Sequence, residues 1–294
     1  MKNRMVEGLV IKHYSGFYYI QDPQHNLFEC TLRGKLKVPV LSGDRVLFTP
    51  VRDSIGVVEE ILPRKNQLYR PKVANVTLVL VVMAFNKPAP DIGLLDRLIF
   101  LSFYYNLIPY IILNKCDLEP DPKSQMILDY YPAAGFNCLT TSATKGTGIE
   151  QLRQVLKGHI TVLAGPSGTG KSSLLNALTG GLAAKTQEVS KKIGRGKHTT
   201  RHVELYPIDN VGYLVDTPGF SVVDLPRIRR NEISAFFPDF TQHIEGCFFK
   251  DCLHFKEQQC SVRRAVEKGI IADFRYQNYV NMLEEIMNNE RYYR

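Results

Sequence analysis

Residues 165–172 read Gly165-Pro166-Ser167-Gly168-Thr169-Gly170-Lys171-Ser172, which matches the pattern G-x-x-x-x-G-K-S. An apolar segment at 160–163 precedes this stretch, and a helical pattern begins at Lys171. A glycine-rich turn between a strand and a helix lets backbone amides approach a phosphate group, and the helix N-terminus adds favourable partial charge. Because both flanks are present, the stretch predicts a phosphate-binding loop in an α/β sheet rather than a chance glycine-rich turn.

The side chains of this loop predict how a nucleotide would be held. Lys171 is expected to reach the β and γ phosphates, and the Ser172 hydroxyl to bind Mg²⁺. The full set of contacts predicted here is Gly165, Pro166, Ser167, Gly168, Thr169, Gly170, Lys171, Ser172 and Ser173. A phosphate loop alone does not distinguish ATP from GTP, so the base must be identified elsewhere in the chain.

A second motif predicts that the base is guanine. Asn114-Lys115-Cys116-Asp117 follows an apolar run at 107–113, and Thr141-Ser142-Ala143 ends the next one. The Asp117 carboxylate can accept hydrogen bonds from the N1 and N2 protons of guanine, which adenine lacks, and such charge-assisted bonds are strong. Asn114 is the other base-reading residue, and Lys115 is expected along the base plane. The amides of Ser142 and Ala143 are expected to meet the guanine carbonyl.

A third motif, Asp216-Thr217-Pro218-Gly219, follows a short apolar strand predicted at 213–215. Asp216 is expected in the Mg²⁺ shell, and the Gly219 amide near the γ phosphate. The next residue is Phe220, whereas many GTPases have a glutamine there that orients the attacking water. A phenylalanine ring cannot make that hydrogen bond. Hydrolysis therefore needs a water-positioning group from elsewhere in the chain, or it is intrinsically very slow.

The segment 185–202 lies between the phosphate loop and the third motif and is rich in glycine and basic residues. This composition predicts a mobile loop. Thr199 and Thr200 are candidates for a residue that binds Mg²⁺ only beside a γ phosphate, with Thr200 assigned as the Mg²⁺ ligand together with Ser172. His198 is the nearest group able to orient water. The catalytic candidates are His198, Lys171, Thr199 and Thr200, although the composition also fits a merely solvated charged loop.

The order of these motifs is unusual, because the base-reading motif precedes the phosphate loop. An ordinary G protein has the phosphate loop first and the Asn-Lys-x-Asp motif last. A circular permutation explains the order, and it is tolerable because nucleotide contacts lie at the carboxyl ends of neighbouring strands. Whatever follows residue 219 is then connected directly to the segment that senses the terminal phosphate.

The N-terminal residues, up to about Arg70, predict a small closed barrel of the OB type, with a basic linker at 63–71. The five β-rich segments lie at 5–14, 17–21, 27–33, 45–51 and 56–62. Aromatic side chains there can stack on RNA bases or fill the barrel core, and the period of two leaves both open. These are Tyr14, Phe17, Tyr18 and Tyr19, with Lys12, Lys35 and Lys37 as nearby charges.

The C-terminal residues contain Cys247-x4-Cys252-x-His254-x5-Cys260. Four soft ligands in so short a window fit one closed tetrahedral Zn²⁺ site with a structural role. Buried free cysteines beside a surface histidine are the alternative, and His243 lies outside the tight cluster. The surrounding pattern is helical, with a closing helix predicted at 270–287. Phosphate contacts or ordinary solvated positions are both open for Arg227, Arg229, Arg230, Arg263 and Arg264.

Composition limits the classes of function. The formal charge is +8 and the sequence pI about 9.1, which favours a polyanionic partner. The longest apolar run, at 77–85, is far shorter than the roughly 20 residues that cross a bilayer, and no N-terminal signal pattern precedes it. The six cysteines do not form a disulfide pattern, so a reducing cytoplasm is expected, without membrane attachment.

Together these observations predict an α/β fold with three domains. Residues 1–66 form an OB-fold RNA-binding domain, 67–226 a circularly permuted P-loop GTPase domain, and 227–294 a helical zinc-binding domain. The chain resembles the RsgA (YjeQ/YloQ) family of small ribosomal subunit biogenesis GTPases in its motif order, barrel, Gly-Arg-Gly-Lys-His-Thr-Thr segment and Cys-Cys-His-Cys site. The resemblance covers essentially the whole chain.

The resemblance implies GTP-dependent binding to the 30S subunit and its 16S rRNA, GTP hydrolysis to GDP stimulated by that subunit, and a role late in its assembly. The family's catalytic switch histidine corresponds to His198, and its zinc ligands to Cys247, Cys252, His254 and Cys260. We expect a monomer that acts as a GTP-gated RNA clamp, in which the second switch passes its order through Pro226 to the zinc domain. A binding module that barely hydrolyses GTP and a P-loop ATPase of RNA metabolism are the rival classes.

Overall fold

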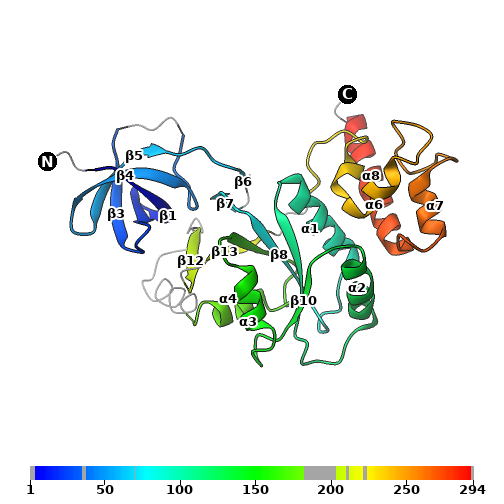
Figure 1. Cartoon of the computed structure of the whole chain (residues 1–294), viewed down its shortest axis with the longest axis horizontal. Helices are drawn as coiled ribbons and strands as arrows, with labels where there is room; N and C mark the ends of the chain where they lie inside the picture. Colours follow the sequence, from blue (N-terminus) through cyan, green and yellow to red (C-terminus); the bar gives the residue numbers. More distant parts are fainter. Residues whose placement is uncertain are drawn as a thin grey trace.

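The computed structural model describes residues 4–34, 38–69, 71–181, 203–209, 212–220 and 224–292, with the backbone alone at 216–220 and 291–292. Three parts follow one another along the longest axis. A small barrel lies at the N-terminal end, an α/β sheet in the centre and a group of helices at the C-terminal end (Figure 1).

The N-terminal part is a closed barrel with the strand order β1-β2-β3-β5-β4. Its strands are β1 (Val6–Tyr14), β2 (Phe17–Gln21), β3 (Leu27–Leu32), β4 (Arg45–Arg52) and β5 (Ile55–Ile61). Side chains on one face of each strand fill the interior, because successive residues point to opposite faces. This core consists of Val10, Ile20, Cys30, Val40, Val46, Phe48 and Val58. The closed five-stranded arrangement confirms the predicted OB-type barrel.

The central sheet has the strand order β10-β9-β8-β11-β13-β12. It consists of β8 (Leu78–Ala84), β9 (Ile108–Asn114), β10 (Cys138–Thr141), β11 (Ile160–Ala164), β12 (Glu204–Ile208) and β13 (Gly212–Phe220). Neighbouring strands are parallel except for β12, which pairs antiparallel with β13 at the edge. The carboxyl ends of β9, β10 and β11 therefore lie on one side of the sheet, although the chain reaches them in permuted order.

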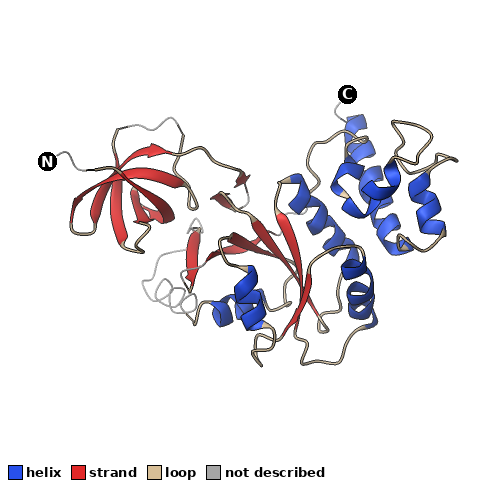
Figure 2. Ribbon diagram, viewed as in Figure 1, coloured by secondary structure: helices blue, strands red, loops and turns tan. Residues whose placement is uncertain are grey.

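Helices cover both faces of this sheet (Figure 2). In the central strand β8, the odd residues from 79 to 83 share a core cluster with α1 (Ile92–Tyr104) and α2 (Pro122–Ala133). The even residues from 78 to 82 share another with α3 (Ile149–Val155) and α4 (Lys171–Leu178). A strand buried on both faces reads as a continuous apolar run, which is how it is found in the sequence. The predicted doubly wound α/β domain is confirmed.

The C-terminal part is helical, as predicted. It contains η1 (Ile233–Phe236), α6 (Pro238–Ile244), α7 (Ser261–Glu267) and α8 (Asp273–Tyr292). Between barrel and sheet, the predicted linker contains strand β6 (Gln67–Tyr69), which pairs with β7 (Lys72–Ala74). Within the described residues, no helix is both long and apolar enough to cross a membrane. All six cysteines lie in the described part of the chain, and none forms a disulfide.

Candidate nucleotide site and metal centre

Asn114 joins the three segments predicted to hold the nucleotide. It ends β9 and is 1% exposed. Its Nδ2 donates to the Thr169 carbonyl of the glycine-rich loop at 2.9 Å. Its Oδ1 accepts from Thr141 Oγ1 at 3.1 Å and from the Ala143 amide at 3.3 Å. The Asn-Lys-x-Asp motif, the Thr-Ser-Ala motif and the phosphate loop therefore meet at one amide side chain, which the sequence could suggest only as three separate motifs.

The Asp117 carboxylate is exposed beside this junction. Ser142 Oγ donates to its Oδ1, and this bond, with the nearby Lys145 and Lys115 ammonium groups, holds the pKa of Asp117 below its ordinary value. The carboxylate is therefore ionised at neutral pH and able to accept hydrogen bonds from a base. Lys115 has a left-handed backbone (φ 66°), and its Nζ donates to the Lys87 carbonyl.

Two glycines of the loop are required by close backbone packing. Gly165 has φ 132°, and a Cβ there would lie 2.1 Å from the Val82 carbonyl oxygen. Gly170 has φ 91°, and a Cβ there would lie 2.2 Å from Asn114 Nδ2. Any side chain at these positions would push the loop away from β8 or from Asn114. The glycines thus hold the loop against the base-reading segment as well as opening it to a phosphate.

Lys171 begins α4 and lies over the loop. Its Nζ donates to the carbonyls of Gly165 at 2.9 Å and Pro166 at 2.6 Å. Partial burial lowers the pKa of its ammonium group. Ser172 and Ser173 follow it in the first turn of the helix and are exposed. This ammonium group and the helix N-terminus provide the positive potential that a phosphate chain requires.

The third motif lies on β13, beside the strand that leads into the loop. Val215 pairs with Val162 of β11 and, after an irregularity in the register, Phe220 pairs with Ala164, so the backbone of the motif runs beside the end of β11. Residues 216–219 fall within the stretch described by backbone alone, so the position of the Asp216 side chain stays a prediction. His198, Thr199 and Thr200 lie outside the described residues, as does the whole segment 185–202. Their catalytic and Mg²⁺-binding roles stay predictions.

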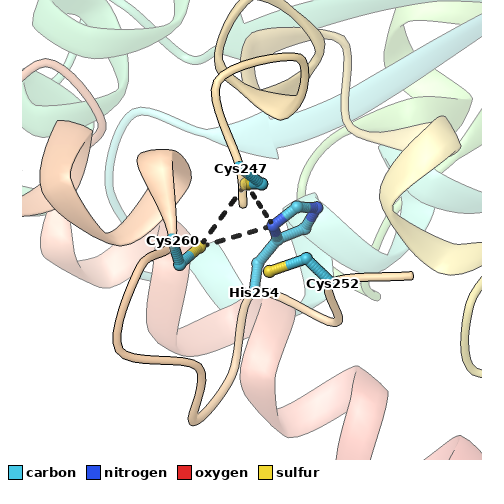
Figure 3. Close-up of side chains that lie close together, drawn as sticks. All are labelled: Cys247, Cys252, His254 and Cys260. Atoms are coloured by element: carbon cyan, nitrogen blue, oxygen red, sulfur yellow. Dashed lines mark hydrogen bonds between the residues drawn. The ribbon is translucent and has the colours of Figure 1, made fainter. Parts of the chain in front are cut away.

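Cys247, Cys252, His254 and Cys260 form one cluster, with their ligand atoms all within 4.8 Å of one another (Figure 3). The distances from His254 Nδ1 to the sulfur atoms are 3.5 Å for Cys247 and 3.4 Å for Cys260. The sulfur atoms of Cys247 and Cys260 are 3.9 Å apart. Zn–S bonds of about 2.3 Å and Zn–N bonds of about 2.0–2.1 Å give tetrahedral edges of about 3.8 Å between sulfurs and about 3.6 Å between sulfur and nitrogen.

The protonation chemistry of the cluster also fits a cation. Burial lowers the pKa of His254, which keeps the imidazole neutral. Burial, together with the thiols of Cys260 and Cys247, raises the pKa of Cys252 to about 12. Three thiols this close do not ionise together unless a cation compensates their charge. The cluster is therefore compatible with zinc binding, and His243 is not part of it among the described residues.

Residues that the sequence analysis missed hold the ligand loop. Tyr276 Oη donates to the His254 carbonyl at 2.9 Å, and Tyr279 Oη to the Leu253 carbonyl at 2.8 Å, both from α8. The Glu257 carboxylate accepts hydrogen bonds from the loop amides of Leu253, Phe255 and Lys256. No spacing rule identifies these partners, because a tyrosine on an amphipathic helix is ordinarily a packing residue.

A buried charge network joins the zinc-binding part to the sheet domain. Arg275 of α8 is 0% exposed and forms a two-pronged bond with Asp239 of α6, at 2.9 and 3.0 Å. It also donates to Asp96 of α1 at 2.6 Å. Tyr131 Oη of α2 donates to the same Asp96 oxygen at 2.5 Å, and Asn278 Nδ2 donates to the other at 2.7 Å. Both carboxylates are thus fully bonded, which a buried ion pair requires.

Comparison with known proteins agrees with this geometry. Residues 61–226 match the family model described as RsgA GTPase, and residues 7–58 match the RsgA N-terminal domain. The "Small ribosomal subunit biogenesis GTPase RsgA" of Carboxydothermus hydrogenoformans is 46% identical over 290 residues, which cover 97% of this chain and 99% of that protein. The protein of the same name from Moorella thermoacetica is 43% identical over 289 residues, covering 97% and 99%.

Two solved structures are also similar to this chain. The crystal structure of YloQ, titled a circularly permuted GTPase, has a TM-score of 0.84 at 34% identity and covers 97% of this chain and 96% of that one. YjeQ from Thermotoga maritima has a TM-score of 0.84 at 36% identity, covering 97% and 99%. With its permuted nucleotide motifs gathered at one edge of the sheet, the chain belongs to the RsgA GTPase family and is a GTP-hydrolysing enzyme.

Proposed function

We propose that this chain binds the 30S ribosomal subunit in its GTP form, hydrolyses GTP to GDP and phosphate with stimulation by the subunit, and acts late in small-subunit assembly. The names of its relatives support this role, since they describe small ribosomal subunit biogenesis GTPases. The single observation that carries the enzymatic part is the bonding of Asn114 to both the phosphate loop and the Thr-Ser-Ala segment.

The proposed domain boundaries are those expected from the sequence, at 1–66, 67–226 and 227–294. The matches to 7–58 and 61–226 support a division near these points. Zinc, held by Cys247, Cys252, His254 and Cys260, would contribute folding energy to the last domain. We further propose that the protein is a cytoplasmic monomer.

The positions of the described side chains support the nucleotide contacts proposed for Asp117 and Lys171. Asp117 would accept the N1 and N2 protons of guanine, and the Ser142 bond holds its carboxylate ready to do so. Lys171 would exchange its bonds to the loop carbonyls for phosphate oxygens. Mg²⁺, when bound, neutralises charge on the β and γ phosphates, and Ser172, Thr200 and Asp216 are the residues that would hold it.

Water positioning is assigned to His198. Phe220 occupies the position where other GTPases use a glutamine, so the group that orients the attacking water must come from elsewhere. His198 lies beside the two candidate switch threonines in the sequence and has a side chain of suitable chemistry. If His198→Ala hydrolysed GTP at the wild-type rate with 30S present, this assignment would fail.

The contacts to 16S rRNA are proposed for both flanking domains. On the barrel, Tyr14 and Phe17 are exposed, as stacking on RNA bases requires, whereas Tyr18 and Tyr19 are half-buried. Several arginines of the last domain already have partners within it. Arg230 is bonded to Glu290, and Arg264 to the Gly246 carbonyl. Arg227 and Arg229 are exposed, and Arg229 is the better candidate for a phosphate contact.

Sedimentation with ribosomal particles tests the whole proposal. The protein should pellet with 30S in GTP or a non-hydrolysable analogue, pellet less with GDP, and not be retained on 50S. Phosphate release under multiple turnover should rise when 30S is added. Retention without turnover would instead indicate a binding module, and displacement of labelled GTP by ATP would indicate an ATPase.

A further inference from the structure

The barrel contacts the sheet domain at its β12–β13 edge. Lys12 Nζ on β1 donates to Glu204 Oε1, the first residue of β12, at 3.0 Å. The exposed fractions of these side chains are 37% and 22%, so water reaches the pair only in part. Ser42 Oγ, which is buried, donates to the Val203 carbonyl at 2.7 Å. Lys12 is one of the charges that the sequence offers for RNA binding, but its ammonium group is paired across the domains.

The same edge carries the third nucleotide motif. β12 pairs antiparallel with β13, and Glu204 lies directly opposite Asp216 in this register. Tyr213, earlier on β13, donates through its Oη to Gln21 Oε1 of the barrel at 2.6 Å. The barrel therefore contacts β12 at Glu204, which lies opposite Asp216, and it contacts β13 at Tyr213, about three residues before Asp216.

Among the described residues, β12 is the edge strand of the sheet and pairs with β13 alone. The barrel turn that contacts β12 is held in place by a hydrogen bond and by close packing. Asp44 Oδ2 accepts from the Leu41 amide at 2.7 Å, which closes the turn around Ser42. A Cβ on Gly43 would lie 2.2 Å from the Ala74 carbonyl oxygen, so this turn is packed directly against the start of the sheet domain.

We propose that Lys12, Gln21 and Ser42 of the barrel are positioning residues for GTP hydrolysis, because they fix the β12–β13 edge that presents Asp216. The inference rests on the proposed function, in which Asp216 belongs to the Mg²⁺ shell. The barrel residues act through the strand pair and touch neither nucleotide nor metal. The position of Asp216 thus depends on a domain that the nucleotide motifs do not include.

The test uses the full-length protein without ribosomes, so that RNA contacts of the barrel do not enter. Lys12→Met and Glu204→Gln should each lower kcat about two- to fivefold, the size expected for a half-exposed ion pair. The Mg²⁺ concentration for half-maximal rate should rise by a similar factor. KM for GTP should change less than about twofold, because the base and phosphate-loop contacts are unaltered.

Two further variants separate positioning from general damage. The charge-swapped double variant, Lys12→Glu with Glu204→Lys, should restore kcat and the Mg²⁺ requirement. Arg33→Met is the matched control, because Arg33 pairs with Glu59 within the barrel and away from β12. It should behave as wild type. Wild-type kcat and Mg²⁺ dependence in both single variants, or equal losses in the Arg33 control, would overturn the inference.

A second readout keeps the inference testable if hydrolysis is too slow to follow. Binding of a fluorescent non-hydrolysable GTP analogue is measured against Mg²⁺ concentration, and the same two single variants should require more Mg²⁺. Failure of the wild-type protein to bind or hydrolyse GTP would contradict the proposed function. Normal wild-type binding with unchanged Mg²⁺ dependence in the variants would contradict only the positioning role.

Discussion

The GTPase domain meets its two flanking domains through junctions of opposite character. Towards the zinc domain, Arg275 and the carboxylates of Asp96 and Asp239 are buried, and every carboxylate oxygen has a donor. Towards the barrel, the Lys12–Glu204 pair is half-exposed and lies on an edge strand. A buried charged junction is costly to separate, whereas a half-exposed ion pair contributes little to the free energy of unfolding.

This difference changes the expected route of the nucleotide signal. The sequence analysis expected the second switch to act on the zinc domain through Pro226. The structure describes that domain as joined to α1 and α2 by the Arg275 network, on the opposite face from α4 of the phosphate loop. The barrel instead contacts the strand that faces Asp216. We therefore expect the barrel to respond more directly to nucleotide than the zinc domain does.

Metal removal has the largest expected effect, and it should unfold the zinc-binding domain without affecting the barrel. Chelation should unfold the C-terminal helices, since structural zinc in small domains contributes about 10 kcal/mol to folding. Hydrogen exchange should then lose protection in α6, α7 and α8. The barrel, which has its own core, should keep its protection. Equal loss in both would mean that the two flanks are coupled more strongly than their junctions indicate.

Breaking the buried Arg275 network should have the second-largest effect on stability. Arg275→Met leaves Asp96 and Asp239 buried without their cation, which costs about 3–5 kcal/mol in the free energy of unfolding. Urea unfolding followed by circular dichroism measures it. Arg229→Met, at an exposed position in the same domain, is the control and should change stability by less than about 0.5 kcal/mol. A similar small change for Arg275→Met would show that the junction is not charge-dependent.

A third test asks whether the buried network affects the site that reads the base. The two are close in the chain, because α2 begins shortly after Asp117 and its Tyr131 is bonded to Asp96 of the network. Asp117→Asn exchanges an acceptor for a donor and should change the preference from GTP to xanthosine triphosphate by at least about tenfold. Calorimetric titration with both nucleotides measures it. Arg275→Met should leave the wild-type preference intact. A changed preference in that variant would mean that the network reaches the base site.

The smallest effect is expected at the barrel junction. Lys12→Met should lower the free energy of unfolding by only about 0.2–1 kcal/mol, because water already screens the pair. The same urea titration measures it beside Arg275→Met. A loss as large as that of the Arg275 variant would remove the contrast between the two junctions.

Local patterns predicted the Cys/His cluster and the motifs that the structure brings together at Asn114. Each ligand set lies within a short stretch, such as 114–117 or 247–260, so residue type and spacing carry the chemistry. The strand and helix flanks of the glycine-rich loop also predicted an α/β sheet, whereas the strand order of that sheet was not predicted. These parts of the molecule depend on residues close together in the sequence, or on motifs whose ligands are recognisable from residue type and spacing.

Long-range pairs left no such signal. Arg275 and Asp96 are separated by 179 residues, and an arginine on an amphipathic helix looks like a solvated one. α2 carries Pro132 and has few buried residues, so its apolar pattern is weak. β12 is a short edge strand directly after residues that the structure does not describe. Lys12 offered only a charge, and its partner Glu204 lies 192 residues away.

The hydrophobic interior has one further consequence, for dissecting the molecule. Leu98 of α1 lies in the same continuous apolar cluster as Tyr279 and Leu283 of α8. Among its buried residues the barrel contributes only Ile11 to this cluster, and Val10 and Phe48 belong to the barrel's own core. A truncation after residue 226 would expose the apolar face of α1 that α8 buries, and such an exposed apolar surface promotes aggregation. A cut between barrel and sheet would expose far less, so the enzyme and its metal-bearing end are best prepared as a single fragment.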